Sequence, residues 1–334
     1  MVDTKPKRSI AVVIPCYQVK AHIQRVLEAI PDYVDAVICV DDACPEKSGD
    51  YIKSISRDER VSVYWHDQNQ GVGGAMLTGF KAAQTAGHEI AVKIDGDGQM
   101  DPSLISLFVD PILEGEADYT KGNRFWDSRS LVSMPKIRVV GNAILGFLNK
   151  FSSGYWRIMD PTNGYVAIHL SVFQLLDTTK IASSYFFESD MLFRLNIARA
   201  VVKDIPMDAR YGDEVSNLKI HKIILPFLCG HARNALKRLL YSYLIRDFSL
   251  ASIELILGPI LLCFGTVFGA WHWYLSSFEG LQATSGQVML AALPMIVGLQ
   301  LLLSALNFDI TNEPKVPLQR MIKRKSILDT QEKC

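Results

Sequence analysis

Two long stretches without charged residues constrain the fold of this chain more than any other feature. Residues 255–278 contain no Asp, Glu, Lys or Arg, and neither do residues 280–308. Each stretch exceeds the roughly 20 apolar residues that a helix needs to cross a bilayer. Two buried helices of a soluble domain are the alternative, but the lengths argue against it. We therefore expect a two-helix transmembrane hairpin within residues 249–310.

Basic residues lie on both sides of this hairpin, whereas the link between its helices, "SSFEGLQATSGQ", has none. The flanking cations are Arg233, Lys237, Arg238, Arg246, Lys315, Arg320, Lys323, Arg324 and Lys325. Short loops rich in Lys and Arg stay in the cytoplasm. We expect an integral protein of the cell inner or plasma membrane, with a cytoplasmic N-terminus and a basic cytoplasmic tail over residues 311–334. The short apolar run Ile10–Ile14 fits a first strand better than a signal peptide.

Residues before the hairpin alternate between strand-like and helix-like segments. The strand-like segments are "SIAVVIP", "DAVICVDD", "VSVYWH", "EIAVKID" and "ADYTKGNR", and helical patterns separate them. Strand–helix alternation with short connections predicts an α/β fold, with an open, mostly parallel sheet covered by helices on both faces.

Acidic residues end two of these predicted strands. Asp41 and Asp42 follow one strand, and Asp95 and Asp97 follow another. Open α/β sheets bind ligands at the carboxyl ends of their strands, so these acids predict a ligand site. Asp101 is different, because the sequence Asp-Pro-Ser is typical of a helix cap followed by proline at the first helical position.

Residues 219–248 join the two parts of the chain and predict amphipathic juxtamembrane helices. Leu236, Leu239, Leu240, Tyr243 and Leu244 repeat at helical spacing, with Lys237, Arg238 and Ser242 on other faces. We expect this segment to lie in the lipid headgroup region. An ordinary surface helix packed on the soluble domain is the alternative.

Composition excludes some functions. The chain has 35 basic and 35 acidic residues, so net charge gives no reason to expect a nucleic-acid partner. Its six cysteines form no CxxC pair and no zinc-type cluster with histidine, as expected in a reducing compartment. "GVGGA" has Met76 where a dinucleotide fingerprint needs its third glycine, which argues against a dinucleotide site.

Several motifs occur in order and together resemble glycosyltransferase family 2, in particular its polyprenyl-phosphate branch, the relatives of dolichyl-phosphate mannose synthase. They are "VVIPCYQ", "CVDDAC", "NQGVGGA", "IDGDGQMDP", "KGNR", "DPTNGYVAI" and "FFESDML", and the resemblance covers residues 9 to about 220. It implies that residues 1–218 are a cytoplasmic nucleotide-sugar glycosyltransferase domain with a GT-A-like sheet. The branch commonly has Arg where this chain has Val166, so that motif is not expected to bind phosphate here.

The resemblance implies a donor site at the strand ends. The implied nucleotide-sugar contacts are Pro15, Tyr17, Asp41, Asp42, Asn69, Gly71, Asp95, Asp160 and Asn163. Asp95, Asp97 and Gln99 are implied ligands of Mg²⁺ or Mn²⁺, cations that prefer oxygen ligands and accept phosphate oxygens in open positions. Asp97, Glu188 and Asp190 are implied catalytic residues, and whether Glu188 or Asp190 is the key acid stays open. The alternative for the last two is a helix start that favours acids.

An acceptor site for a lipid phosphate is implied as well. Its expected residues are Arg124, Arg138, Asn142 and Arg210, because a guanidinium matches phosphate in bidentate geometry. Surface ion pairs are the alternative for the arginines.

We therefore expect a metal-dependent, inverting transfer of a hexose from GDP-mannose or a UDP-hexose to undecaprenyl or dolichyl phosphate, a step in cell-wall or other glycan biosynthesis. A non-catalytic nucleotide-sugar-binding scaffold is the alternative. A polysaccharide synthase is disfavoured because Gln-x-x-Arg-Trp is missing and two spans are too few for a polymer channel. Gly265 and Gly269 permit close helix contact, either between chains in a homo-oligomer or within the hairpin.

Overall fold

The computed structural model describes residues 9–127, 136–208 and 220–331. The chain divides into two compact units. The first comprises Met1–Ala235 together with Pro314–Cys334, and the second comprises Leu236–Glu313.

The first unit is built on a seven-stranded sheet. Its strands are β1 (Ile10–Cys16), β2 (Ala36–Asp41), β3 (Val61–Trp65), β4 (Ile90–Lys93), β5 (Tyr119–Asn123), β6 (Val166–His169) and β7 (Val202–Pro206). They lie in the order β3-β2-β1-β4-β6-β5-β7, and only β6 runs antiparallel to its neighbours β4 and β5. This confirms the predicted open, mostly parallel sheet. The carboxyl ends of β1, β2, β4 and β5 therefore share one edge with the loop that precedes β6.

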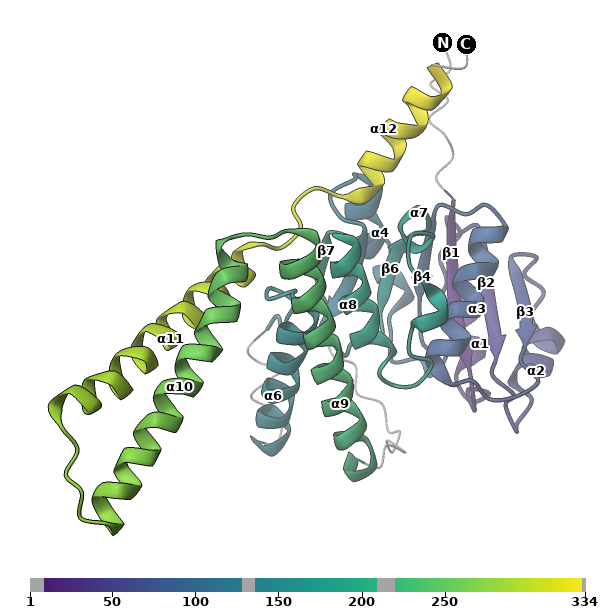
Figure 1. The fold of residues 1–334 in the computed structure, drawn as a ribbon. Helices are drawn as coiled ribbons and strands as arrows, with labels where there is room; N and C mark the ends of the chain where they lie inside the picture. The colour runs from purple at the N-terminus through teal and green to yellow at the C-terminus, as the bar shows by residue number, and fades with distance from the viewer. Residues whose placement is uncertain (1–8, 128–135, 209–219, 332–334) are drawn as a thin grey trace. The chain divides into compact units, whose positions relative to one another are not determined.

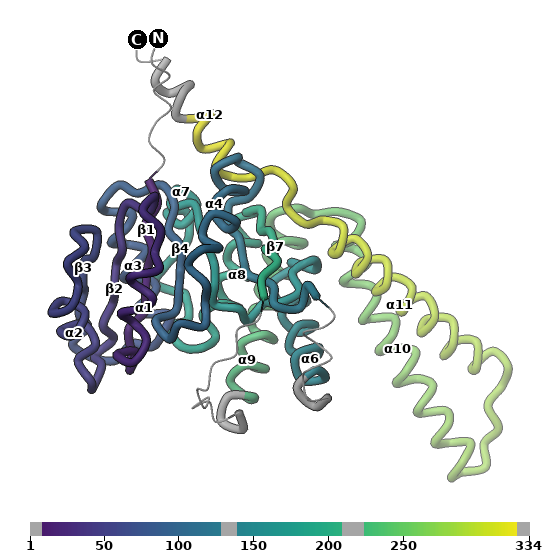
Figure 2. The backbone as a smooth tube through the Cα atoms, turned by 180° about the vertical axis from the view of Figure 1, so that it is seen from behind, coloured from purple at the N-terminus to yellow at the C-terminus, as the bar shows by residue number. Residues whose placement is uncertain are grey.

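Helices cover both faces of the sheet (Figures 1 and 2). The helices and turns outside α10 and α11 and the π-helix before them are α1 (Ile23–Glu28), α2 (Ser48–Ile55), α3 (Gly71–Thr85), the 3₁₀ turn η1 (Pro102–Leu104), α4 (Ile105–Leu113), α6 (Lys136–Ser153), α7 (Leu170–Phe173), η2 (Thr178–Lys180), α8 (Phe187–Ala198), α9 (Ile220–Leu239) and α12 (Leu318–Gln331). Side chains of α3, α7 and α8 form the core on one face, and those of α1, α2 and α4 form the core on the other.

Strand alternation decides which residues of β4 meet which core. Ala91 packs in the α3–α8 core, whereas Ile90 and Val92 pack in the α1–α4 core. Lys93 follows at the next position on the α8 side, because successive side chains of a strand point to opposite faces. A fully buried lysine thus ends the strand on the face that α8 covers.

The C-terminal helix α12 begins on the first unit. The buried Asp118 carboxylate, next to β5, accepts hydrogen bonds from the backbone nitrogens of Leu318 (2.8 Å) and Gln319 (2.9 Å). Asp118 also accepts from the Val201 nitrogen at 2.8 Å. One carboxylate thereby caps the start of α12 and joins it to the loop before β7.

The second unit contains the two long apolar helices α10 (Leu250–Phe278) and α11 (Ser285–Thr311). Both are long and apolar enough to cross a membrane. They cover the charge-free stretches from which the sequence predicts a hairpin.

Small residues bring α10 and α11 together. A Cβ added to Gly298 would lie 2.7 Å from the Leu262 nitrogen and 2.8 Å from the Gly258 carbonyl oxygen. A Cβ added to Gly265 would lie 2.6 Å from the Ala291 carbonyl oxygen. Gly265 therefore packs within the hairpin in this structure.

A buried polar cluster lies at one end of the second unit. Arg238 pairs with Asp309 through both carboxylate oxygens, at 2.5 and 2.9 Å. The Tyr243 hydroxyl, in the π-helix η3 (Leu240–Arg246), bonds to the same carboxylate. This bidentate pair joins the residues before α10 to the end of α11.

Candidate active site

The end of β4 brings three charged side chains together on the α8 face. The Lys93 ammonium lies 2.9 Å from Asp95 Oδ1 and 3.4 Å from Glu188 Oε1, and its side chain is 2% exposed. Burial alone lowers the pKa of Lys93, but the charges of Asp95 and Glu188 outweigh it and the net pKa is raised. The Asp95 side chain is 30% exposed, so it is accessible to a ligand at the sheet edge.

The loop after Asp95 is a tight turn. The Asp97 carboxylate accepts a hydrogen bond from the Gln99 nitrogen at 2.9 Å, and Gly98 between them has φ of +77°. Only glycine adopts that backbone conformation without strain. Asp101 caps η1 through the Ser103 nitrogen, with Pro102 at the first position of the turn. The cap predicted for Asp101 is thus confirmed.

The two acids at the end of β2, Asp41 and Asp42, accept hydrogen bonds from backbone nitrogens of neighbouring loops. Asp41 accepts hydrogen bonds from the nitrogens of Cys44 and Gly49, at 2.7 and 2.5 Å. Asp42 accepts from the nitrogens of Gln70 and Gly71, both at 2.8 Å. Each residue is 3% exposed. Their carboxylates therefore shape the loops at this edge.

Asn69, a predicted donor contact, and His66, which the sequence did not single out, lie beside this pair of acids. His66 Nδ1 lies 2.7 Å from Asp42 Oδ1, and the Asn69 side chain donates to the Asp42 carbonyl at 3.1 Å. Pro15 is half-buried near the end of β1, and Tyr17 just beyond it is 47% exposed. The first-strand, second-strand and Asn-x-Gly motifs thus meet at the same edge.

The loop before β6 carries a second ion pair. The Asp160 carboxylate is fully buried and receives Arg124 in bidentate geometry, at 2.7 Å from Nε and 3.1 Å from Nη2. The Lys121 ammonium, buried in β5, donates to the Asn163 carbonyl. Burial lowers the pKa of Lys121 to about 8, although Glu188 and Asp160 oppose that shift.

Glu188 and Asp190 have different surroundings although both belong to the first turn of α8. Asp190 is fully buried and accepts from the Ala182 nitrogen (2.9 Å), Arg194 Nε (3.0 Å) and Asn234 Nδ2 (2.9 Å). It therefore ties the loop before α8 to α9. Glu188 pairs with Lys93 and thus faces the Asp95 side of the site.

Residues 11–176 match the profile of glycosyl transferase family 2. The chain carries a glycosyl transferase family 2 domain. This confirms the family predicted from the ordered motifs. The "FFESDML" motif of this glycosyltransferase lies just beyond the matched residues.

Curated relatives confirm the resemblance to the polyprenyl-phosphate branch. The UDP-N-acetylglucosamine–dolichyl-phosphate N-acetylglucosaminyltransferase of Methanococcus voltae is 29% identical over 215 residues, which cover 59% of this chain and 85% of that protein. The undecaprenyl-phosphate mannosyltransferase of Micrococcus luteus is 28% identical over 191 residues, which cover 55% of this chain and 74% of that protein.

Solved structures share the fold of the glycosyltransferase domain. A structure of Mycobacterium tuberculosis glucosyl-3-phosphoglycerate synthase, in complex with Mn²⁺, UDP-glucose and phosphoglyceric acid, superposes with a TM-score of 0.51. Sequence identity is 18%, and the alignment covers 69% of this chain and 79% of that one. The likeness supports the predicted GT-A-like sheet.

The predicted acceptor residues of the glycosyltransferase are only partly described. Arg124 is 34% exposed and pairs with Asp160, as above. Asn142 is half-buried on α6. Arg138 belongs to the same helix, but its side chain lies outside the described residues, as does Arg210 altogether.

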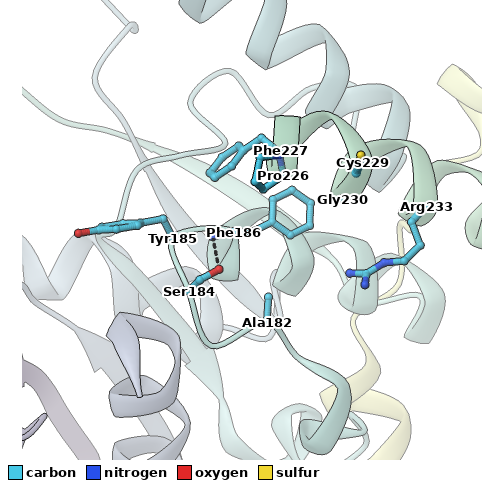
Figure 3. A pocket seen from close by; sticks show the side chains of 9 residues that line it. All are labelled: Ala182, Ser184, Tyr185, Phe186, Pro226, Phe227, Cys229, Gly230 and Arg233. Carbon is cyan, nitrogen blue, oxygen red and sulfur yellow. Dashed lines mark hydrogen bonds between the residues drawn. The ribbon is translucent and has the colours of Figure 1, made fainter. Parts of the chain in front are cut away.

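An apolar pocket lies between α9 and the loop before α8 (Figure 3). Its volume is about 430 Å³. Within its lining, the rings of Phe186 and Phe227 pack edge-to-face with their centroids 5.3 Å apart. Pro226 and Gly230 of α9 complete the apolar wall, and the Arg233 side chain lies at one side of it. The pocket thus combines an apolar surface with one cation.

Sequence reasoning missed the buried lysines of the site. Lys93 lies inside the apolar run "IAVKID" and Lys121 inside "TKGNR". A lysine within a buried strand is rarely left without a partner, and that expectation was the available signal. Sequence reasoning also missed His66, whose ring nitrogens lie within hydrogen-bond distance of Asp42 and Thr78.

The loop over residues 95–101, called the metal loop below, has side chains whose chemistry fits a divalent cation. Asp95 and Asp97 supply the oxygen donors that Mg²⁺ and Mn²⁺ prefer. No cluster of three or more His, Cys, Asp or Glu side chains suited to a metal occurs among the described residues. Mg²⁺ in nucleotide sites is usually bound by one or two carboxylates together with substrate phosphates, which matches this pair of acids.

Proposed function

We propose that this protein transfers a hexose from a nucleoside-diphosphate sugar to a polyprenyl phosphate at the cytoplasmic face of the membrane. The donor is GDP-mannose or a UDP-hexose, and the acceptor is undecaprenyl or dolichyl phosphate. The observation that carries the proposal is the Asp95–Lys93–Glu188 arrangement at the carboxyl edge of the sheet. It occurs in a chain that also has two helices apolar enough to cross a membrane.

The donor's diphosphate is held at the metal loop. Asp95, Asp97 and Gln99 are the proposed ligands of Mg²⁺ or Mn²⁺, which when bound stabilises the charge that develops on the leaving diphosphate. Pro15, Tyr17, Asn69 and Gly71 line the nucleoside side of the edge. Asp41 and Asp42 hold the loops there through hydrogen bonds from backbone nitrogens. Their carboxylate oxygens can also accept hydrogen bonds from hydroxyl groups of the nucleoside.

Glu188 is the acid that we place at the sugar. It is half-buried and faces Asp95 across Lys93, whereas Asp190 uses both carboxylate oxygens for structural hydrogen bonds. A phosphate acceptor is already anionic near neutral pH, so no strong base is needed and positioning dominates. Attack by the phosphate oxygen from the face opposite the leaving diphosphate inverts the anomeric carbon.

The acceptor fits the pocket beside α9. Its aromatic and aliphatic lining suits an isoprenoid chain, and Arg233 suits the phosphate. Arg124, Arg138, Asn142 and Arg210 remain proposed phosphate contacts. Arg124 makes two hydrogen bonds to Asp160, and it would give up one of them to bind the acceptor phosphate.

A release assay tests the proposal. Membranes containing the protein are given undecaprenyl or dolichyl phosphate and a panel of UDP- and GDP-sugars, with and without Mn²⁺, and nucleoside diphosphate and glycolipid are measured. We expect one donor to react, only with metal, and Asp95→Ala and Asp97→Ala to abolish transfer. Full turnover by either variant would contradict the proposed metal site.

Asp101→Ala is the matched control, because Asp101 lies in the same loop but caps η1. We expect it to keep its turnover and lose about 1 kcal/mol of stability. Nucleotide-sugar binding without release of nucleoside diphosphate would instead favour the non-catalytic scaffold. The anomeric configuration of the product, read by NMR, tests inversion.

A further inference from the structure

Lys93 connects two parts of the site that are far apart in the sequence. Asp95 belongs to the metal loop, and Glu188 lies 95 residues beyond Lys93 on α8. The ammonium contacts both, and the side chain is 2% exposed, so water does not take the place of either carboxylate. An ammonium has three donors in flexible directions, which lets one group serve two acceptors.

The loop before β6 closes over this ammonium. A Cβ added to Gly164 would overlap the Lys93 Nζ atom and would lie 2.9 Å from Asp95 Oδ2. A side chain at position 164 would have to displace the Lys93 ammonium or the Asp95 carboxylate, so the glycine lets the "DPTNG" loop lie directly against this pair. The end of β4, the start of α8 and the loop before β6 together surround the Lys93 ammonium.

Because the Lys93 ammonium is buried, its charge acts strongly on the carboxylates of Asp95 and Glu188. Without a cation between them, Asp95 and Glu188 would repel one another in a site of low dielectric constant. Each would also lose the partner that limits its rotamers. A buried cation with two partners is therefore a device for holding two acids near each other in fixed orientations.

We propose that Lys93 is a positioning residue for sugar transfer, which holds the metal-loop carboxylate of Asp95 and the sugar-side carboxylate of Glu188 at a set separation. The inference rests on the proposed function and deepens it. Asp95 stays turned toward the diphosphate, and Glu188 is kept from turning into the metal loop. Lys93 itself touches neither the sugar nor the diphosphate.

The test uses the full chain in detergent and compares wild type with Lys93→Met and Lys93→Gln. Mn²⁺ binding is measured by electron paramagnetic resonance with UDP and, separately, with GDP. Transfer is measured with the donor that the release assay identifies. We expect both variants to bind Mn²⁺ roughly tenfold more tightly, because a nearby positive charge is gone and Glu188 becomes available to the cation. We expect kcat to fall at least about tenfold.

Lys121→Met is the matched control. Lys121 is an equally buried lysine of β5, which β6 separates from β4, and its described hydrogen bond goes to the Asn163 carbonyl. We expect it to lower the melting temperature while changing Mn²⁺ affinity by less than about threefold. In a Glu188→Gln background, Lys93→Met should cost much less kcat than it does alone, since one of the two carboxylates no longer carries a charge.

The outcomes separate this inference from the proposed function. If wild type binds no Mn²⁺ with either nucleotide, the proposed metal site fails and the inference with it. If wild type binds Mn²⁺ but both Lys93 variants match it in affinity and kcat, only the inference fails. If both Lys93 variants bind Mn²⁺ more weakly, in proportion to a lowered melting temperature, Lys93 is a merely structural lysine and the inference is overturned.

Discussion

At the scale of single residues, neighbouring acids of one motif have different tasks. Glu188 and Asp190 are two positions apart at the start of α8, yet one meets Lys93 and the other meets Ala182, Arg194 and Asn234. Two positions on a helix differ by about 200° around its axis, so the side chains leave in different directions. Their shared sequence context therefore does not give them a shared function.

Substitution should separate the two roles. We expect Asp190→Ala to reduce the free energy of unfolding by about 3 kcal/mol, because it leaves Asn234 and Arg194 without their buried carboxylate. We expect Glu188→Gln to have a melting temperature within a few degrees of wild type and a lower kcat. Thermal unfolding and transfer assays on both variants check this, and the reverse pattern would exchange the two assignments.

Asp204 should give the stability of the first unit a pH dependence. Burial raises the pKa of this β7 residue from 3.8 to about 6, so the folded state binds its proton more tightly than the unfolded state. Stability is therefore lost as pH rises from about 4 to about 6. The difference corresponds to about 3 kcal/mol at 1.36 kcal/mol per pKa unit.

The Asp204→Asn variant removes this titration. We expect it to be more stable than wild type at pH 7 and to lack the decline between pH 4 and 6. Denaturant unfolding across that range measures both. Parallel pH curves for the two proteins would be inconsistent with a raised pKa at Asp204.

At the scale of elements, glycines set how closely α10 and α11 approach. The backbone of Gly298 meets that of Gly258, and Gly265 meets the Ala291 carbonyl. Close backbone approach through small residues is how membrane helices pack without a hydrophobic drive between them. The hairpin therefore depends on a few positions rather than on its many leucines.

A bulky residue at the crossing should open the hairpin. We expect Gly298→Val to lower the detergent melting temperature and to expose α10 and α11 to protease, since the new side chain would overlap Leu262 and Gly258. Gly286→Val is the control, because a Cβ at Gly286 meets nothing within 4 Å. Equal loss of stability in both variants would argue against the crossing.

At the scale of the whole molecule, the chain leaves the first unit before α10 and returns to it after α11. Two membrane crossings bring a chain back to the side from which it left. A return to the same side is what the charge pattern predicts, because basic residues lie on both flanks of the hairpin and none lies in the link between its helices. Two basic residues of α12 bond to the rest of the first unit: Lys323 pairs with Glu89 at 2.7 Å, and Arg320 donates to the Glu114 carbonyl at 3.3 Å.

Cysteine labelling tests this topology. In a background without the native cysteines, we expect Gln282→Cys in the link to react with an impermeant maleimide from outside intact cells. Lys325→Cys should react only after the membrane is opened. Labelling of both positions from the same side would contradict a two-span hairpin.

Local pattern predicted much of this architecture, and its limits are physical. The β-branched runs of β1, β2 and β4 and the charge-free helices are visible without any tertiary contact. The sequence pattern does not predict strands β6 and β7, because the short segments "VAIH" and "VKDIP" carry little periodicity. The partners of Asp41 and Asp42 could not be anticipated either, since the direction of a carboxylate depends on loops that close only when the chain folds.

The cap on α12 has a consequence for the order of synthesis. Asp118 emerges from the ribosome 200 residues before Leu318, the residue whose nitrogen it accepts. Both long apolar helices are made in between. The first unit can therefore be completed only after both apolar helices have been translated. A nascent chain that has not yet made the hairpin therefore also lacks the helix that closes its first unit.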